Sequence, residues 1–363
     1  MKHQPDYILI SVIFALVIFG LVILSSASVV LSQDLANQSY YFLKHQLLYG
    51  VLLGLVGFFI FQKISYKYWH KFSLPLLILS LLSLALVFIP QTGFSHGGAK
   101  RWVDLGIFSF QPFEFVKITF ILYLSALLSR KGSGREVIKE SLIPFLVVIV
   151  TIGLLVCFQP NISALIIIFL IASLIYFLAK VKITHLLVLA GLALAGFFAL
   201  IKTAPYRASR LTVFLHPEID PQGIGYQINQ ALLAIGSGGL FGLGLGHSIQ
   251  KWKYLPEVIG DSIFAIVAEE LGFIGAGILV ALFVLLAWRG LRITRQASDK
   301  FGYLLAGGIT GWIFFQAVIN MAAISRLIPM TGLPLPFVSY GGSAMVVTLI
   351  GAGILINISK HTN

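Results

Sequence analysis

The chain is poor in charged residues: only 10% of its 363 residues are Asp, Glu, Lys or Arg, whereas 58% are hydrophobic. A soluble protein of this length would carry about 25% charged residues, so the composition excludes a soluble protein and places most of the chain in a membrane. Cysteine is nearly absent, because Cys157 is the only one. A single cysteine excludes internal disulfides and cysteine-based metal sites, and we interpret Cys157 as a small buried hydrophobe.

Apolar runs that are long enough to cross a bilayer recur along the sequence. A hydrocarbon core of about 30 Å needs roughly 18 or more apolar residues in a helix. Suitable runs lie near residues 7–30, 43–61, 70–89, 112–129, 141–158, 161–179, 184–202, 261–288, 301–324 and 336–358. The sequence therefore predicts an all-α integral membrane protein with ten transmembrane helices, folded as one polytopic domain over residues 1–363. The first run is too long for a signal-peptide core and is expected to be an uncleaved anchor.

The net charge of +12 is distributed unevenly between the two sides of the membrane. When the N-terminus is placed in the cytoplasm, the cytoplasmic segments carry nearly all of the basic excess and the outer segments are close to neutral. This is the positive-inside pattern, and it predicts that both termini are cytoplasmic. We therefore interpret the excess as a topology signal and expect no nucleic-acid partner.

Two outer segments are longer than simple helix connections, at about 90–111 and 203–260. The second is a large extracellular loop between the seventh and eighth expected helices, and a loop of that length is usually functional or disordered. Helical periodicity over residues 226–235 favours a helix at the membrane interface over disorder. The glycines at 236–246 match neither dinucleotide-binding nor Walker A spacing, so no nucleotide cofactor is expected.

Asp261 stands where the large outer loop meets the eighth apolar run. A carboxylate at this junction costs little if it faces water and a great deal if it faces lipid. On a helical wheel it shares a face with Ala265, Ala268, Gly272 and Gly275, and such small residues let another helix approach closely. We therefore expect the carboxylate to point into the protein. An N-cap role at the start of the helix is a second interpretation, compatible with the first.

Other charged residues lie within the apolar runs. Glu269 and Glu270 are roughly 12–13 Å along the helix from Asp261, too far for a direct acid–base pair. Acids at that depth need partners, so a structural or gating ion pair is favoured over a catalytic role. Glu114 and Lys117 are three residues apart and can pair on one helix face. They form either a structural salt bridge or a site where Lys117 faces an anionic substrate.

Cations on the outer side run against the positive-inside pattern and therefore favour a function. They are Lys100, Arg101, Arg207, Arg210, Lys251, Lys253 and Arg326. They could bind a lipid-linked pyrophosphate or, as the alternative, anionic headgroups. Residues 331–343 are rich in Pro and Gly and must be non-helical, which is tolerated only where backbone is buried in protein or lines a polar cavity. This places Ser339, Tyr340 and Ser343 near the same outer vestibule.

Several of these segments, in this order, resemble the SEDS family (shape, elongation, division and sporulation proteins), and the resemblance covers nearly the whole chain. The matching motifs are Gly-Ala-Lys-Arg-Trp at 98–102, Gln-Pro-Phe-Glu-Phe-Val-Lys at 111–117, Gly-Tyr-Gln at 225–227, Tyr-Leu-Pro-Glu at 254–257, Ala-Glu-Glu-Leu-Gly at 268–272 and Pro-Phe-Val-Ser-Tyr-Gly-Gly-Ser at 336–343. Residues 244–256 resemble the division branch, FtsW, more than the elongation branch, RodA. Two departures exist. Gln-Pro-Asn-Ile-Ser-Ala at 159–164 replaces the family's Gln-Pro-Asp-Leu/Phe-Gly-Thr, and Ile259-Gly260 stands where the family often has His-Thr.

The resemblance implies a peptidoglycan glycosyltransferase of the bacterial cytoplasmic membrane that polymerises lipid II into glycan strands at the outer face, for septal wall synthesis at the division site. It implies that Asp261 matches the family's essential acid, and Asp261 is the expected catalytic residue. The expected substrate-binding residues are Arg101, Glu114, Lys117, Arg210, Gln227, Glu257, Ser339, Tyr340 and Ser343. Lipid II, the growing glycan strand, membrane lipids, a class B penicillin-binding protein and other division proteins are the expected partners.

The expected reaction is attack of a lipid II sugar hydroxyl on the anomeric carbon of the growing glycan, with lipid pyrophosphate leaving. Asp261 would act as general base, a role worth typically about 10²–10⁴-fold. Arg101, Lys117 and Arg210 would offset the pyrophosphate charge, together with a divalent metal, Mg²⁺ or Mn²⁺, that Asp261 could also bind. A lipid II flippase, a RodA-like elongation polymerase and a non-catalytic division scaffold stay open as alternatives. Because the candidates cluster at the outer rim and not at the midplane, the enzyme is favoured over the transporter.

Overall fold

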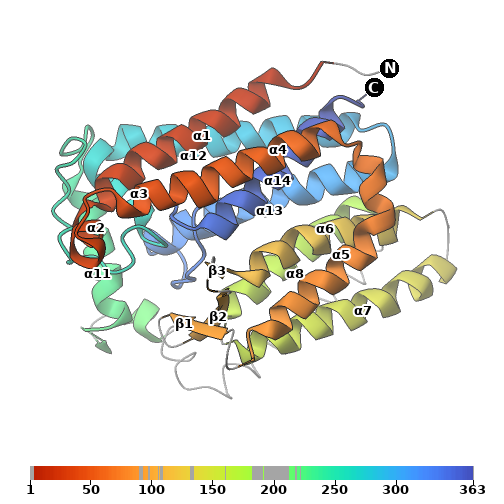
Figure 1. Ribbon diagram of the computed structural model, residues 1–363, viewed down its shortest axis with the longest axis horizontal. Helices are drawn as coiled ribbons and strands as arrows, with labels where there is room; N and C mark the ends of the chain where they lie inside the picture. The colour runs from red at the N-terminus through yellow and green to blue at the C-terminus, as the bar shows by residue number, and fades with distance from the viewer. Residues whose placement is uncertain are drawn as a thin grey trace.

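The computed structural model describes residues 4–89, 93–96, 99–104, 106, 109–130, 135–159, 161–181, 191, 212–216, 219–220 and 222–362. Long helices run side by side along the molecule, and a small sheet lies beside them (Figure 1). The helical elements are α1 (Tyr7–Ala27), α2 (Val29–Ala36), α3 (Tyr41–His45), the π-helix η1 (Gln46–Leu52), α4 (Leu53–Lys63), α5 (Tyr66–Leu86), α6 (Pro112–Ser129), α7 (Arg135–Phe158), α8 (Ile162–Leu178), α11 (Ile224–Ser237), α12 (Ile263–Gln296), α13 (Lys300–Ile324) and α14 (Gly342–Ser359).

The described part of the first outer segment contains a small antiparallel sheet, which the all-helical expectation did not include. Its strands, in spatial order, are β1 (Gly93–His96), β2 (Ala99–Asp104) and β3 (Ser109–Phe110). Strand pairing satisfies backbone N–H and C=O groups that a plain loop would leave to water. In the second outer segment, α11 covers the stretch where sequence periodicity predicts a helix, and it packs against α12.

Seven helical segments of the described chain are long and apolar enough to cross a membrane. They are α1, the continuous segment Tyr41–Lys63, α5, α6, α12, α13 and α14. The apolar parts of α7 and α8, Ile143–Phe158 and Ser163–Leu178, are shorter. The run expected at 184–202 lies outside the described residues except for Gly191. The chain is thus a mostly helical membrane protein, and the full set of ten spans stays a prediction.

The two ends of the chain lie at the same end of the bundle, opposite α2 and α11 (Figure 1). Asp6 connects three helices at this end. Its carboxylate accepts the backbone N–H of Leu9 at 2.9 Å, which caps α1, and pairs with the Arg289 guanidinium of α12 at 2.6 Å. Its own N–H donates to the Ser359 hydroxyl of α14 at 3.1 Å. These contacts hold the first turn of α1, α12 and the last turn of α14 together at this end of the bundle.

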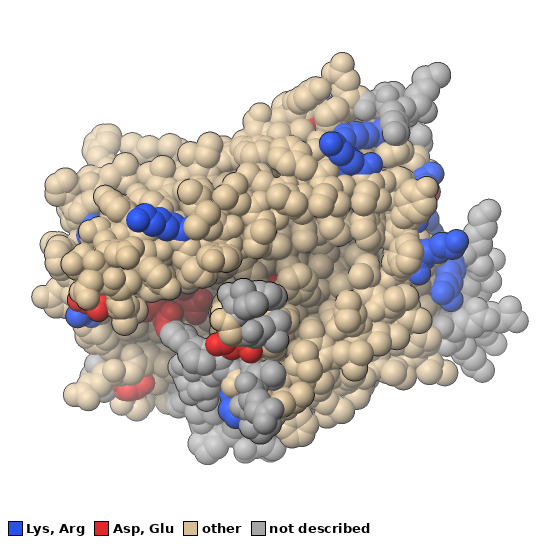
Figure 2. Space-filling view, in the orientation of Figure 1, with Lys and Arg blue, Asp and Glu red and all other residues tan. Residues whose placement is uncertain are grey.

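The helices pack closely where glycine replaces a side chain. α14 packs along α4, and a Cβ on Gly353 would lie only 2.6 Å from the Phe58 carbonyl oxygen. Close contacts at small residues are typical of helix association in lipid, because burying apolar surface between helices does not stabilise their association there. Large apolar side chains such as Ile278 and Trp288 of α12 are 52% and 58% exposed, as expected for lipid-facing positions. Most of the face shown in Figure 2 is uncharged; acidic atoms gather left of and below its middle, and basic atoms lie mainly toward the right-hand end.

α12 is interrupted at Gly272, whose φ of 67° and ψ of −167° are not helical. The carbonyls of Glu269 and Glu270 and the N–H groups of residues 273 and 274 bind backbone groups of segment 239–244 at 2.9–3.2 Å. The glycine-rich segment therefore serves as the hydrogen-bonding partner of a broken helix. Because the helix is interrupted, the continuous helical wheel through Gly272 and Gly275 is wrong. The N-cap interpretation of Asp261 is also wrong, because Ser262 occupies the N-cap position.

Candidate active site around Asp261

Asp261 lies in the turn that ends the large outer loop, two residues before α12 begins. Its side chain is half-buried and lies against Gly332, where a Cβ would be 3.2 Å from the Asp261 Oδ2. Gly332 also has a φ of +68°, which favours glycine over residues with a Cβ. The chain at 332 thus leaves room for the carboxylate, which faces protein on this side, as the sequence predicts.

The backbone that leads up to the Asp261 carboxylate is held by donors from other elements. The carbonyls of residues 259–261 accept, in order, the N–H of Tyr340 at 2.8 Å, the hydroxyl of Ser339 at 2.7 Å and the amide of Asn320 at 2.8 Å. Each of three successive carbonyls is therefore fastened either to α13 or to the segment before α14. The turn is held at every residue that leads up to the carboxylate.

Residues 331–341 form the irregular segment that the prolines and glycines predict, and it too is held by side chains of α13. The Asn320 amide also donates to the Leu333 carbonyl at 2.7 Å, and the Gln316 amide donates to the Pro334 carbonyl at 2.8 Å. The Ser163 hydroxyl of α8 donates to the Thr331 carbonyl. Non-helical backbone at this depth is tolerated because such partners replace the missing helical hydrogen bonds.

Glu114 and Lys117 form the ion pair that their spacing predicts. The Lys117 Nζ lies 2.8 Å from the Glu114 Oε2 and 2.9 Å from the Gln316 Oε1. Lys117 is fully buried and Glu114 is 3% exposed, and the ammonium also lies 5.0 Å from the centroid of the Trp312 ring. In this arrangement Lys117 contacts protein on every side described, so its role in substrate binding stays a prediction.

Three further residues of the expected substrate site lie around the Asp261 turn. The Gln227 amide of α11 donates to the Ser262 hydroxyl at 3.1 Å. Tyr340 shares a hydrogen bond of 3.0 Å with the His45 Nδ1, and burial raises the pKa of Tyr340 to about 12. Glu257 has an exposed side chain, and its carbonyl accepts the N–H groups of residues 260 and 262.

The remaining expected residues are held elsewhere or lie outside the described chain. Arg101 on β2 is half-buried and donates through its Nε to the Gln159 carbonyl at 3.4 Å. The Ser343 hydroxyl, at the start of α14, accepts the backbone N–H of Gln111 at 3.1 Å. Arg210 lies outside the described residues. The described contacts therefore gather Gln227, Ser339 and Tyr340 around Asp261 but give Arg101 and Ser343 other neighbours.

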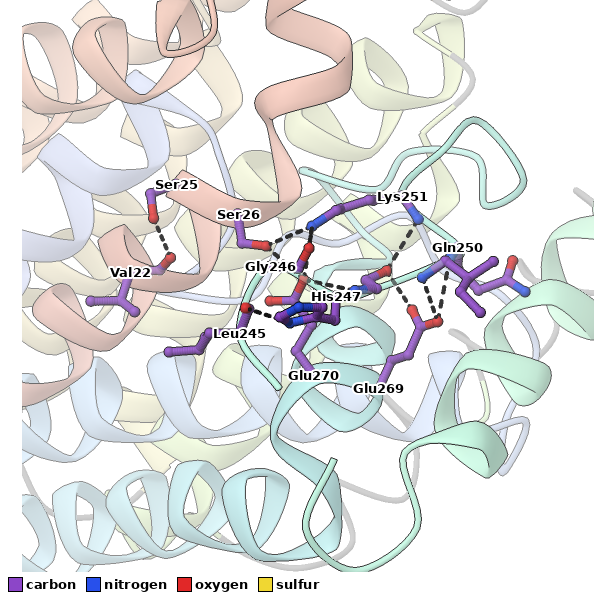
Figure 3. Close-up of polar contacts among 12 residues, drawn as sticks. Val22, Ser25, Ser26, Leu245, Gly246, His247, Gln250, Lys251, Glu269 and Glu270 are labelled. Atoms are coloured by element: carbon purple, nitrogen blue, oxygen red, sulfur yellow. Dashed lines mark hydrogen bonds and ion pairs between the residues drawn. The ribbon is translucent and has the colours of Figure 1, made fainter. Parts of the chain in front are cut away.

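Glu269 and Glu270 form a separate buried network, as Figure 3 shows. The Glu270 Oε1 lies 3.2 Å from the Lys251 Nζ and accepts the Ser26 hydroxyl at 2.6 Å. Glu269 accepts the Ser248 hydroxyl and the N–H groups of residues 249 and 250. The ion pair favoured from the sequence is found for Glu270, whereas hydrogen bonds hold Glu269. The network anchors the large outer loop to α1 and to the end of the first half of α12.

Asn320 and Gln316 were not singled out by the sequence analysis, although both contact the site. A usable signal was present, since two amides four residues apart on one helix face are unusual within an apolar run. A preassembled metal centre is not found among the described side chains, where no three His, Cys, Asp or Glu residues converge. Mg²⁺ often binds through one or two carboxylates plus substrate phosphates, so Asp261 fits such an ion only together with a phosphate-bearing substrate.

Comparisons with known proteins cover nearly the whole chain. The family model described as "Cell cycle protein", FTSW_RODA_SPOVE, matches residues 6–363. "Stage V sporulation protein E" of Bacillus subtilis is 38% identical over 361 residues, which cover 99% of this chain and 98% of that protein. "Probable peptidoglycan glycosyltransferase FtsW" of Trichlorobacter lovleyi is 39% identical over 356 residues, which cover 98% of this chain and 93% of that protein.

Solved structures show the same fold. A chain from a structure on the structural coordination of polymerization and crosslinking by a peptidoglycan synthase complex superposes with a TM-score of 0.80 at 28% identity, covering 98% of this chain and 97% of that chain. The rod shape determining protein RodA of Thermus thermophilus superposes with a TM-score of 0.71 at 28% identity, covering 98% of this chain and 96% of that chain.

Proposed function

The chain belongs to the FtsW/RodA/SpoVE family of cell cycle proteins, and on this premise we propose that it polymerises lipid II with Asp261 as the general base. Relatives that match almost its whole length bear the name peptidoglycan glycosyltransferase, and this is the activity of the chain. The observation that carries the mechanism is the half-buried Asp261 carboxylate, which stands at the end of a turn whose last three carbonyls, those of residues 259–261, accept donors from other elements.

The reaction belongs to the outer face of the bacterial cytoplasmic membrane. α12 runs from the Asp261 turn toward Arg289, which binds Asp6 beside the termini. The site and the termini therefore lie at opposite ends of α12, whose two helical parts together are long enough to cross a bilayer. With ten spans and cytoplasmic termini, as the charge distribution predicts, Asp261 opens to the outside, where lipid II sugars are exposed.

Asp261 would accept the proton of the lipid II 4-hydroxyl as its oxygen attacks the anomeric carbon of the growing glycan. The new glycosidic C–O bond forms while the bond from that carbon to the pyrophosphate breaks, and the lipid pyrophosphate leaves with the electron pair. Because this leaving group is already activated, one protein carboxylate suffices, unlike the carboxyl pair of glycoside hydrolysis. A divalent ion, when bound, would neutralise charge on the pyrophosphate.

The protein's own cations would serve the same leaving group. Arg101 lies on β2 in the first outer segment, and Arg210 belongs to the second. Arginine binds phosphate oxygens through two parallel hydrogen bonds, so we assign both side chains to the pyrophosphate. Lys117 would have to leave Glu114 and Gln316 before it could contribute. We further propose that Gln227, Glu257, Tyr340 and Ser343 line the path of the sugars.

A direct test is polymerisation of lipid II by the purified protein, with Asp261→Asn as the variant and Asp34→Asn as the control. Asp34 is an exposed acid of α2 that pairs with Lys253 at 2.7 Å, outside the described contacts of the site. Removing a general base is expected to lower the rate at least about 100-fold, whereas the control keeps the wild-type rate. Wild-type speed in Asp261→Asn would refute the general-base role.

A crosslinking partner is part of the proposal. The similar chain from a peptidoglycan synthase complex, which coordinates polymerization with crosslinking, supports a class B penicillin-binding protein as that partner. Polymerisation is therefore to be measured with and without it. If the wild type makes no glycan in either case, the polymerase assignment fails. The FtsW and SpoVE relatives favour a role at the division septum, which a fluorescent fusion would locate.

Lipid II transport is the second candidate, because interrupted helices near the midplane are common in transporters and α12 is interrupted at Gly272. The backbone groups at this break bind segment 239–244 of the protein itself, which favours a structural role for the break. Transport predicts movement of labelled lipid II across liposomes without chain growth, whereas polymerisation predicts chain growth without such movement.

A further inference from the structure

A buried amide holds the turn that carries Asp261. Asn320 lies on α13 and is 2% exposed, so it is out of reach of a substrate. Its Nδ2 donates to the Asp261 carbonyl at 2.8 Å and to the Leu333 carbonyl at 2.7 Å. A side-chain amide nitrogen carries two protons, so both are used on these two carbonyls.

The two carbonyls belong to the two segments that define the carboxylate's position. Asp261 supplies the carboxylate, and Gly332, the neighbour of Leu333, lies directly against its Oδ2. Joining the Asp261 and Leu333 carbonyls through one nitrogen therefore fixes the distance between the acid and the surface that it lies against. The position of α13 relative to α6 and to the 331–341 segment is also fixed, because Gln316, one turn before Asn320, binds both Lys117 and the Pro334 carbonyl.

Both described hydrogen bonds of Asn320 are made by its nitrogen. Its Oδ1 is buried and has no hydrogen-bond partner among the described atoms. A buried acceptor without a partner costs stability, and such costs are typical of functional sites.

Ser339 repeats the arrangement on the other side of the turn. Its hydroxyl accepts the N–H of Leu335 at 2.8 Å and donates to the Gly260 carbonyl at 2.7 Å. The side chain is 5% exposed. Its bond to Gly260 joins the 331–341 segment to the Asp261 turn, and its bond to Leu335 fixes the hydroxyl within that segment. Asn320 and Ser339 thus clamp successive carbonyls, those of residues 261 and 260.

We propose that Asn320 and Ser339 are positioning residues, which hold the Asp261 carboxylate at the hydroxyl that it deprotonates by clamping the turn to α13 and to the 331–341 segment. The inference rests on the proposed function, since it gives the general base its geometry. A misplacement of about 1 Å at a reacting group can cost on the order of 10²-fold in rate. In this proposal Ser339, expected from the sequence to bind substrate, acts instead through the turn, as the buried Asn320 does. Loss of the clamp should therefore lower kcat and leave KM unchanged.

The chain offers a matched control for the asparagine. Asn357 on α14 is also 2% exposed and also joins two backbone groups through its amide: its Nδ2 donates to the Gln62 carbonyl at 2.8 Å, and its Oδ1 accepts the Tyr66 N–H at 2.8 Å. These contacts lie near the termini, at the end of the bundle remote from Asp261. Asn357→Ala should cost as much stability as Asn320→Ala without touching the geometry of the base.

The experiment measures initial rates of lipid II polymerisation over a range of lipid II concentrations, together with the Tm of each purified variant. Asn320→Ala is expected to lower kcat about 10- to 100-fold with KM within about twofold of wild type. Asn320→Asp, which has no donor for the two carbonyls, should lose at least as much. Asn357→Ala should lower Tm to a similar extent and keep kcat within about twofold.

A wild-type kcat in Asn320→Ala overturns the proposal, and so does an equal kcat loss in Asn357→Ala at equal Tm. If Asn320→Ala does not fold, Ser339 decides: Ser339→Ala should lower kcat about tenfold, and Ser339→Thr, which keeps the hydroxyl, should restore most of it. No loss in Ser339→Ala then overturns the clamp. Failure of the proposed function is distinguishable, because in that case the wild type is inactive or Asp261→Asn is as fast as wild type.

Discussion

At the scale of single residues, the buried Lys251 and Glu270 depend on each other, because the fold gives each charge a buried partner of opposite sign. Lys251 and Glu270 are 6% and 0% exposed, and their charges lie 3.2 Å apart. Removing one partner of such a pair leaves an unpaired charge in the interior, which typically costs about 3–5 kcal/mol. Lys251→Met is therefore expected to lower the free energy of unfolding by about that amount, measured by thermal unfolding in detergent.

The control is Lys253→Met, which removes a pair whose members are 65% and 39% exposed. Exposed pairs are worth about 0–1 kcal/mol, so this variant should unfold close to the wild type. Adding Glu270→Gln to Lys251→Met should recover part of the loss, because the uncompensated charge is then gone. Equal midpoints for Lys251→Met and Lys253→Met would show that the buried pair contributes nothing.

Sequence reasoning succeeds for pairs within one helix and stops at pairs between distant segments. Glu114 and Lys117 are three residues apart, so helix geometry alone predicts their contact. Glu270, by contrast, meets Lys251 and Ser26 only through the course of the outer loop, and nothing local to these residues encodes that path. The Asn320 clamp was missed for the same reason, because its two carbonyl partners lie in other segments.

At the scale of elements, the break in α12 sets the geometry of the outer half of the molecule. Gly272 has a positive φ, and a Cβ there would lie 2.3 Å from the backbone nitrogen of Gly242. Gly272→Ala thus combines a strained backbone with a clash against the main chain, and strained positions of this kind cost about 1–3 kcal/mol before the clash is added. We expect a lower Tm and a loss of polymerisation.

Gly277, five residues further along α12, provides the comparison. An added Cβ there meets nothing within 4 Å, and the residue lies within the helix. Because alanine favours helix over glycine by about 1 kcal/mol, Gly277→Ala should be neutral or slightly stabilising. If Gly272→Ala also keeps the wild-type Tm and polymerisation rate, a break in α12 at Gly272 is not required for stability or activity.

Helix continuity is also where the sequence misleads most. An apolar run with isolated glycines is compatible with an unbroken helix, so the wheel drawn from Asp261 through Gly275 had no local contradiction. The break requires partners for its free N–H and C=O groups, and these come from segment 239–244, about thirty residues earlier. The small residues still pack closely, but Gly272 does so against a loop and not against a helix.

At the scale of the whole molecule, the length of the apolar runs carried the prediction furthest. Seven of the expected spans appear as long apolar helices in the described chain, and two more appear as shorter ones. Spans follow from composition, since the bilayer sets both the length and the polarity of each segment. The sheet β1–β3 was not foreseen, because a few residues of loop carry too little pattern to predict pairing.

The side of the membrane on which each loop lies can be tested with single cysteines. In cells whose protein carries Cys157→Ser, single cysteines at Lys253 and Lys67 report opposite sides of the membrane, and both native side chains are well exposed, at 65% and 63%. A membrane-impermeant maleimide should label Lys253→Cys in intact cells and Lys67→Cys only after permeabilisation, because the positive-inside pattern places α5's first turn in the cytoplasm. The Cys157→Ser protein without new cysteines gives the background. Labelling of Lys67→Cys from outside would invert the molecule, place Asp261 in the cytoplasm and remove the basis for an outer-face polymerase.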